Sequence, residues 1–271
     1  MDDSKITIAI PFYNAEQFLA QAIDSVIHQT YEEWRLLLVD DGSTDSSLII
    51  AKEYAEKDSR ITVFSDGKNR NLGYRLNQIA SFVKTEYLAR MDADDIMHPR
   101  RIAEQIKILQ NNSEIDVLGT NAYTIDENNK ISGIRLKGSG DQNLMIVDGF
   151  IHPTIMAKTE WFKAHPYDEQ ALRVEDMELW YRTNKKFDFR VINEPLFYYR
   201  EIGENYYKKY FLANISKEYI IKKYPNSKFW KLFYVTNFIK GIIFKLFNVF
   251  RQEKYLINRR NQVVFKKKIQ F

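Results

Sequence analysis

The segment Tyr87-Leu88-Ala89-Arg90-Met91-Asp92-Ala93-Asp94-Asp95 runs from a short apolar stretch directly into three carboxylates. Residues 87–91 predict a strand, and alternate side chains of a strand share a side, so Asp92 and Asp94 should face the same way with Asp95 turned aside. Carboxylate oxygens suit Mg²⁺ or Mn²⁺, which keep positions for water and substrate phosphates. The segment therefore predicts a divalent-metal site at a strand end. A solvated acidic turn is the alternative interpretation of these residues alone.

Strand and helix patterns alternate on both sides of this segment. Residues 6–12 and 36–39 are apolar runs typical of buried strands, and each is followed by a helical pattern. Residues 61–64 predict a third strand, and apolar spacing over 102–109 predicts a helix after the acidic segment. Alternation over residues 5–110 indicates a mostly parallel sheet with helices on both faces. Such sheets bind ligands at the carboxyl ends of their strands, where these aspartates lie.

Beyond residue 115 the pattern changes to longer strands with a late helix. The chain has 271 residues and is 45% hydrophobic, so we expect one main domain, residues 1–204, with an extension over 205–271. The elements expected in this part are strands over 115–125 and 130–136, a loop at 138–141, a helix over 174–183 and short strands at 191–192 and 196–199.

The amino-acid composition limits the kinds of site the chain can form and indicates its cellular compartment. The chain has no cysteine, which excludes disulfides, thiolate metal sites and a cysteine nucleophile and fits a reducing compartment. A polar start leads directly into a strand, so we expect no secretory signal and a cytoplasmic protein. Residues 221–271 hold thirteen Lys or Arg and one acid, so the preceding part is net acidic. We expect no nucleic-acid partner, because the acidic part would repel phosphates.

Two further acidic pairs accompany the metal-site candidates. Asp40-Asp41 follows the second predicted strand, and Glu175-Asp176 opens the late helix. The three groups together predict a nucleotide-diphosphate site, with acids to bind a base or ribose, to hold a metal and to take a proton from a sugar hydroxyl. Alone, Asp40-Asp41 could be a turn with a helix cap, and Glu175-Asp176 could be an acidic first turn.

Five motifs in register resemble the family 2 inverting glycosyltransferases of GT-A fold. The resemblance covers roughly residues 4–200. The motifs are Ile10-Pro11-Phe12-Tyr13-Asn14, Gln29-Thr30-Tyr31, Val39-Asp40-Asp41-Gly42-Ser43-Thr44-Asp45, Met91-Asp92-Ala93-Asp94-Asp95 and Glu175-Asp176.

The resemblance implies an α/β GT-A fold, with a Rossmann-like mixed sheet flanked by helices, and a metal-dependent enzyme of bacterial surface polysaccharide synthesis. Such an enzyme would move one sugar from a UDP-sugar to a saccharide or lipid-linked saccharide. By resemblance, Asp94 would hold Mn²⁺ or Mg²⁺ and Asp176 would be the general base. The residues implied in nucleotide binding are Pro11, Tyr13, Asp41, Arg75 and Asp92, and those near donor or acceptor are Asp95, His152 and Glu175.

Two departures from the family pattern matter. Relatives commonly carry Asn-x-Gly, whereas here Asn69 and Asn71 align and the glycine moves to Gly73, which leaves the diphosphate contact of Arg75 open. The Gln-x-x-Arg-Trp motif of processive members is absent from the sequence, so we expect single-sugar addition. Two other functions remain open: a membrane scaffold that binds nucleotide or sugar without turnover, and a phosphatase with an Asp nucleophile.

Residues 229–250 form an apolar stretch in the basic extension. Three lysines interrupt it, so we expect no good membrane span but a helix lying on an anionic membrane at the inner face of the cell membrane. Packing of its apolar face on the domain, or on a second subunit of a homo-oligomer, is the alternative. The expected polar stripe holds Lys231, Tyr234, Asn237, Gly241, Lys245 and Asn248, and the expected apolar face holds Phe233, Ile239, Ile243, Phe247 and Phe250.

Overall fold

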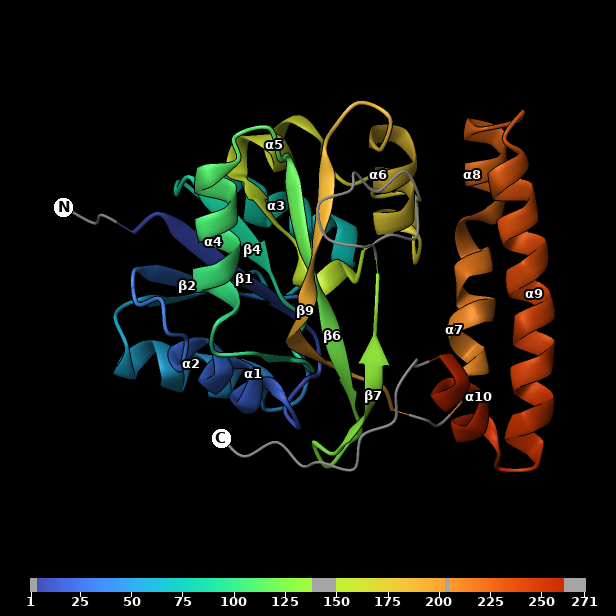
Figure 1. Cartoon of the computed structure of the whole chain (residues 1–271). Helices are drawn as coiled ribbons and strands as arrows, with labels where there is room; N and C mark the ends of the chain where they lie inside the picture. Colours follow the sequence, from blue (N-terminus) through green and yellow to red (C-terminus); the bar gives the residue numbers. More distant parts are fainter. Residues whose placement is uncertain (1–3, 138–149, 203–204, 261–271) are drawn as a thin grey trace.

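A computed structural model describes residues 4–137, 150–202 and 205–260, and its described strands form one mixed sheet (Figure 1). The strands are β1 (Ile6–Phe12), β2 (Trp34–Asp40), β3 (Ile61–Ser65), β4 (Tyr87–Arg90), β5 (Ile96–Met97), β6 (Val117–Ile125), β7 (Ile131–Arg135), β8 (Met156–Lys158) and β9 (Phe189–Arg200). Their order is β3-β2-β1-β4-β8-β6-β9-β5, and β7 pairs with β6. The helices are α1 (Leu19–Ile27), α2 (Ser47–Lys57), α3 (Leu72–Phe82), α4 (Arg101–Asn111), α5 (Thr159–Ala164), α6 (Glu175–Thr183), α7 (Tyr207–Leu212), α8 (Lys217–Lys223), α9 (Lys228–Val249) and α10 (Glu253–Arg260), with 3-10 turns η1 (His152–Thr154) and η2 (Ala213–Ser216).

The first half of the sheet is parallel, as predicted. Strands β3, β2, β1 and β4 run in one direction, so their carboxyl ends share one edge. Alternate β1 side chains pack on opposite faces: Ile8 belongs to the cluster that contains Leu19 and Ile106, whereas Ala9 packs with Leu76 and Trp180. Helices therefore cover both faces, which confirms the predicted α/β fold with a mixed sheet.

The second half agrees less closely with the expectations. β6, β7 and α6 lie where strands and a helix are predicted, but the two short strands expected at 191–192 and 196–199 are one strand, β9. Its register against β6 jumps from Ile192 to Pro195, because proline has no N–H to donate and the ladder skips the residues before it. The loop expected at 138–141 lies outside the described residues.

The orientation expected for the C-terminal helix is wrong. Tyr234, Asn237 and Gly241, placed on the outer polar stripe, face inward with Trp230 and Phe244. An ideal Cβ on Gly241 would lie 2.8 Å from the ring of Phe211 on α7, so close packing selects this face. Of the expected apolar face, Phe233 packs against the cluster that contains Ala171 and Val174, whereas Ile239 and Ile243 are exposed.

The outward side of α9 carries an exposed row of apolar side chains, here called the outer ridge. By length and composition, α9 could also cross a membrane, contrary to the expectation from its lysines. The outer ridge consists of Leu232, Val235, Ile239, Ile243, Leu246 and Val249.

The C-terminal helices are fastened to α6 by a buried charge. Glu178 of α6 is fully buried, and its Oε1 accepts hydrogen bonds from Tyr224 Oη at 2.5 Å and Lys223 Nζ at 2.9 Å. Its Oε2 accepts from Arg182 Nε at 3.0 Å. Trp230 adds apolar contact in the same region. The helix that begins at Glu175 is therefore braced by the extension.

We predict that Glu178→Gln lowers the free energy of unfolding by about 2 kcal/mol, because Lys223 and Arg182 lose the buried charge they pair with. Urea unfolding followed by tryptophan fluorescence measures the change. Glu160→Gln is the matched control, since Glu160 is 82% exposed and pairs with Lys163 on the surface. The control should change stability by less than about 0.5 kcal/mol. Equal effects of the two changes would contradict the bracing role.

Candidate active site

Loops after the first three strands meet at the carboxyl edge of the sheet. Asp41 N donates to Phe12 O at 2.8 Å, and Thr44 N donates to the side-chain oxygen of Asn14 at 2.8 Å. Gly42 has φ 77°, and a Cβ there would lie 2.7 Å from the carbonyl carbon of Lys68. Only glycine allows the loops after β2 and β3 to approach this closely.

Asp41 organises the loop that leads into α3. Its Oδ1 accepts from Arg70 N at 2.7 Å and Arg75 Nε at 2.8 Å, and its Oδ2 accepts from Asn71 N at 3.2 Å. Arg75 is fully buried, and its hydrogen bond to Asp66, at 2.5 Å, is the main cause that lowers the pKa of that carboxyl. Arg75 thus fixes Asp41 in place, and the nucleotide contacts of both residues remain predictions.

The displaced glycine of the family pattern has a structural counterpart. Asn71 precedes α3 with φ 70° and ψ 163°, a backbone conformation that favours glycine. Asn71 occupies the position where relatives commonly have that glycine. The positive φ of Asn71 is therefore a local backbone strain in this loop.

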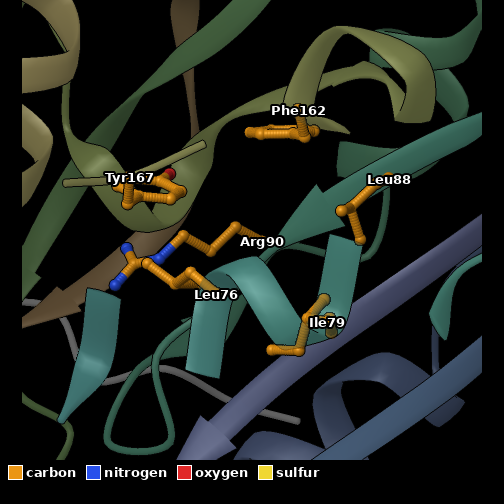
Figure 2. Close-up of a pocket in the computed structure, with 7 residues that line it drawn as sticks. Leu76, Ile79, Leu88, Arg90, Phe162 and Tyr167 are labelled. Atoms are coloured by element: carbon orange, nitrogen blue, oxygen red, sulfur yellow. The ribbon is translucent and has the colours of Figure 1, made fainter. Parts of the chain in front are cut away.

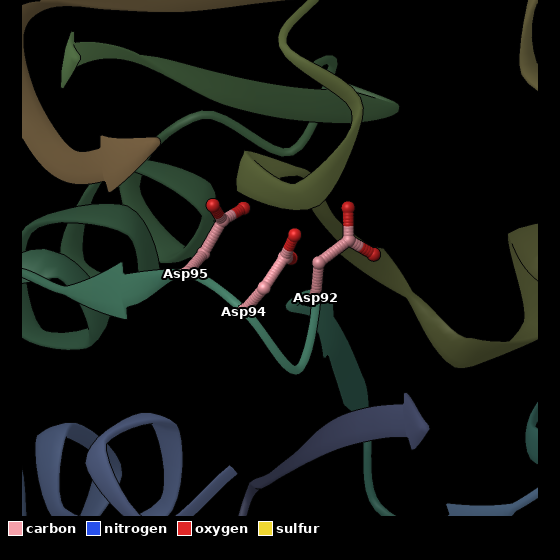
Figure 3. Close-up of side chains that lie close together, drawn as sticks. All are labelled: Asp92, Asp94 and Asp95. Carbon is pink, nitrogen blue, oxygen red and sulfur yellow. The ribbon is translucent and has the colours of Figure 1, made fainter. Parts of the chain in front are cut away.

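The three aspartates lie together, as Figure 3 shows for their carboxylates at the turn after β4. Asp94, the predicted metal ligand, and Asp92 are therefore joined by Asp95, and the expectation that Asp95 turns aside is wrong. One oxygen from each of Asp92, Asp94 and Asp95 lies within 4.8 Å of the others. Asp94 is the exposed member of the cluster; loss of hydration among the surrounding protein atoms, and then the charge of Asp92, raises its pKa to about 6. Burial, and then the neighbouring Asp94 charge, raises the pKa of Asp95 well above its usual range.

Arg200 shapes this cluster from the end of β9. Its backbone N donates to Asp95 Oδ1 at 2.7 Å, and its Nε donates to Asp94 O at 2.6 Å. Asp95 Oδ2 is buried and has no hydrogen-bond partner among the described residues. A concentrated set of carboxylates with an unpaired buried oxygen fits a divalent cation with oxygen ligands.

Arg90 lies between two acidic groups. Its Nη2 donates to Asp92 Oδ1 at 2.7 Å, while Nε and Nη1 are buried without a hydrogen-bond partner in the described part of the chain. Burial alone would lower the pKa of Arg90, but the charges of Asp92, Tyr167, Asp176 and Glu175 together raise it. Arg90 therefore links the metal-site candidates to the start of α6.

The hollow beside Arg90 is not a substrate site. Figure 2 shows Arg90 extending toward Tyr167 among the apolar side chains of Leu76, Ile79 and Phe162. The hollow has a volume of ≈ 10 Å³, which is too small for a sugar. It serves to surround the guanidinium.

Asp176 and His152 meet at the first turn of α6. Asp176 Oδ2 lies 3.6 Å from His152 Nδ1, and the Asp176 side chain is 38% exposed. His152 Nε2 lies 2.8 Å from Tyr167 Oη. Burial, reinforced by the charge of Arg90, lowers the pKa of His152 well below its usual range, so the imidazole is neutral. A neutral His152 can orient Asp176 without forming an ion pair with it.

Most of the predicted site residues lie on the elements expected for them. Pro11 is buried at the end of β1, Tyr13 just beyond it is half exposed, and Glu175 adjoins Asp176. Sequence reasoning missed the contributions of Arg90, Arg200 and Tyr167. Arg90 stands inside the quoted motif, but a strand-end arginine carries no local sign of its buried partners.

A sheet with a parallel half, an acidic turn after β4 and an acidic helix start in the mixed half is the architecture of GT-A glycosyltransferases. The crystal structure of Staphylococcus aureus TarS 1-349 in complex with UDP matches with a TM-score of 0.62 at 19% identity, covering 79% of this chain and 65% of that chain. A mannosyltransferase from Pyrobaculum calidifontis in complex with GDP-Man and Mn²⁺ matches with a TM-score of 0.59 at 14% identity, covering 80% and 64%.

Residues 7–168 match the model of Glycosyl transferase family 2, and the chain belongs to that family. EpsE of Bacillus subtilis, named as a glycosyltransferase, is 32% identical over 225 residues, 80% of each chain. The UDP-Glc:alpha-D-GlcNAc-diphosphoundecaprenol beta-1,3-glucosyltransferase WfgD of Escherichia coli is 32% identical over 133 residues, 49% of this chain and 51% of WfgD. The resemblance is confirmed, and the chain is a glycosyltransferase rather than a phosphatase.

We predict that Glu175→Gln removes a pH-dependent loss of stability. Burial, and then the charge of Asp176, raises the pKa of Glu175 from near 4.5 to about 7. The folded wild type therefore keeps this proton where the unfolded chain has lost it, and its stability falls as pH rises from 4.5 to 7. Urea unfolding at pH 5 and pH 8 should show the variant gaining about 2 kcal/mol over the wild type across this interval. Parallel pH dependence of the two proteins would contradict the raised pKa.

Proposed function

We propose that this glycosyltransferase moves a single sugar from a UDP-sugar to a saccharide or lipid-linked saccharide, with inversion at the anomeric carbon. The observation that carries the proposal is the position of Arg90, which hydrogen-bonds Asp92 and also interacts electrostatically with Asp176 and Glu175. The two acidic groups therefore border one site. An inverting transfer needs such an arrangement, with donor and acceptor on either side of the reacting carbon.

The donor side is the acidic turn after β4. Asp94 would hold Mn²⁺ or Mg²⁺, with Asp95 Oδ2 as a neighbouring ligand. When bound, the ion would stabilise the negative charge of the departing diphosphate. Asp92 faces the same side, where the donor ribose would lie, and its charge is partly balanced by Arg90.

The nucleotide would lie over the loops after β1 and β2. Pro11 and Tyr13 would line the base pocket, and Asp41 would accept a hydrogen bond from the base. Arg75 holds Asp41 at 2.8 Å and so supports this contact whether or not it reaches the diphosphate itself. The choice of UDP is supported by the TarS complex with UDP and by the UDP-Glc in the name of WfgD.

The acceptor side is the first turn of α6. Asp176 would take the proton of the acceptor hydroxyl while that oxygen forms its bond to the anomeric carbon. The carbon–oxygen bond to the diphosphate breaks, and the bonding electron pair leaves with the diphosphate. The exposed side of Asp176 can receive the proton, and His152, 3.6 Å away, is neutral and does not hold this carboxylate in an ion pair.

A lipid-linked acceptor would require the enzyme to work at a membrane surface. WfgD is named for an acceptor on diphosphoundecaprenol, a lipid carrier. We propose a lipid-linked saccharide as acceptor here, in polysaccharide synthesis, with the enzyme peripheral at the cytoplasmic face of the cell membrane. Residues 1–204 would then form the catalytic domain and residues 205–271 the membrane-facing extension.

We predict that, in assays with a panel of UDP-sugars and GDP-mannose, the enzyme turns over one donor and does so only when Mn²⁺ or Mg²⁺ is present. Asp176→Asn should lower kcat by about 10²- to 10⁴-fold with little change in donor Kd, because it removes the base and leaves the donor side intact. Asp94→Ala should abolish the metal-dependent part of donor binding. Initial rates and calorimetric titrations measure both.

Glu160→Gln, exposed and outside the site, is the control and should behave as wild type. The mechanism would be overturned if the wild type turned over donor equally fast in the presence of a metal chelator, or if Asp176→Asn kept the wild-type rate. Donor binding without turnover by the wild type, even with lipid-linked acceptors, would favour the scaffold interpretation.

A further inference from the structure

The outer ridge of α9 is an apolar surface that the described chain leaves uncovered. Its six side chains are between 42% and 72% exposed. Soluble proteins seldom expose a continuous apolar row of this length without a partner. Figure 1 shows α9 as the outermost helix, with α7 and α8 between it and the sheet.

Positive charge borders the ridge on both sides. A helix turns about 100° per residue, which places Lys231 and Lys245 along one edge of the ridge and Lys240 along the other. All three lysines are exposed, and α9 contains no acidic residue. Lysine stems can lie along apolar surface while their ammonium groups reach outward to anions. A second copy of this chain would bring these like charges together, whereas an anionic lipid surface complements them.

The apolar surface continues from α9 onto α7 and η2. Leu212 and Ile215 are exposed beside α9 and, with Phe211 and Lys208, line a hollow of ≈ 260 Å³. The uncovered apolar surface therefore includes the end of α7 and part of η2.

The inner face of α9 limits how the helix can meet lipid. Trp230 and Tyr234 are almost fully buried in one cluster with Ala171 and Val174. Crossing a membrane would pull these side chains out of that cluster. Lying flat buries the ridge in lipid and keeps the cluster intact.

We infer that the outer ridge, with Leu212 and Ile215 and the flanking lysines, docks the protein flat on an anionic lipid surface. Apolar side chains enter the acyl boundary, and the lysines contact anionic headgroups. This orientation would hold the enzyme at the surface that carries a lipid-linked acceptor. Only this last statement rests on the proposed function.

Sedimentation with vesicles tests the inference on the full chain. Wild type should bind vesicles of phosphatidylglycerol and phosphatidylcholine and bind vesicles of phosphatidylcholine alone much more weakly. Replacing Lys231, Lys240 and Lys245 together by Gln should weaken anionic binding about a hundredfold. Changing Ile239 and Ile243 together to Glu should weaken it at least about tenfold. Ile49→Glu on α2, an equally exposed apolar site elsewhere, is the matched control and should bind as wild type.

Two further measurements separate this inference from the proposed function. All variants should keep wild-type donor turnover and the same unfolding midpoint, because the altered side chains are exposed. The docking inference fails if wild type does not bind anionic vesicles, if the ridge changes have no effect, or if the ridge instead forms a dimer in solution. Association that resists alkaline carbonate would show a spanning helix and also overturn it. Vesicle binding without any donor turnover would leave docking intact and remove the proposed function.

Discussion

Three carboxylates of one short turn stand closer together than their charges favour, and the site depends on how the chain holds them there. Arg90 balances Asp92 from the preceding strand, and the backbone of Arg200 anchors Asp95 across 105 positions of sequence. Burial first, and then the charge of the neighbouring carboxylates, raises the pKa of Asp94 and of Asp95. A divalent cation held by these carboxylates would offset the repulsion between their charges.

The second half of the sheet positions residues that contact this turn. β9 brings Arg200 to the acidic residues, and its neighbour β6 carries the hairpin whose turn residues Asp126 and Asn129 hold the same guanidinium. The start of α6, which carries Asp176, is built separately, because α6 is fastened through Glu178 to the C-terminal helices. Arg90 lies between the acidic turn after β4 and the start of α6, and its positive charge offsets the negative charge of both.

Sequence patterns predict the parallel half well because its signals are local. Apolar runs such as residues 36–39 end at acidic turns, and the Glu175-Asp176 pair marks a helix start directly. Strands of two or three residues, β5 and β8, are too short to carry a pattern. The side of α9 that faces the protein depends on a residue distant in sequence, Phe211, whose ring fits only over Gly241. Because apolar side chains occur on most sides of α9, its sequence alone does not show which side faces inward. The partners of Arg90 and Arg200 are likewise set by the tertiary structure and not by local sequence patterns.

The buried charge of Glu178 makes the extension part of the enzyme's architecture. A chain ended at residue 204 would lose Lys223, Tyr224 and Trp230, leaving the buried Glu178 carboxyl without two of its hydrogen-bond donors and an apolar face uncovered on the helix that begins at Glu175. An expression boundary drawn after the last motif would therefore cut through the support of α6. The smallest unit that keeps this support is the sheet together with the C-terminal helices packed on α6.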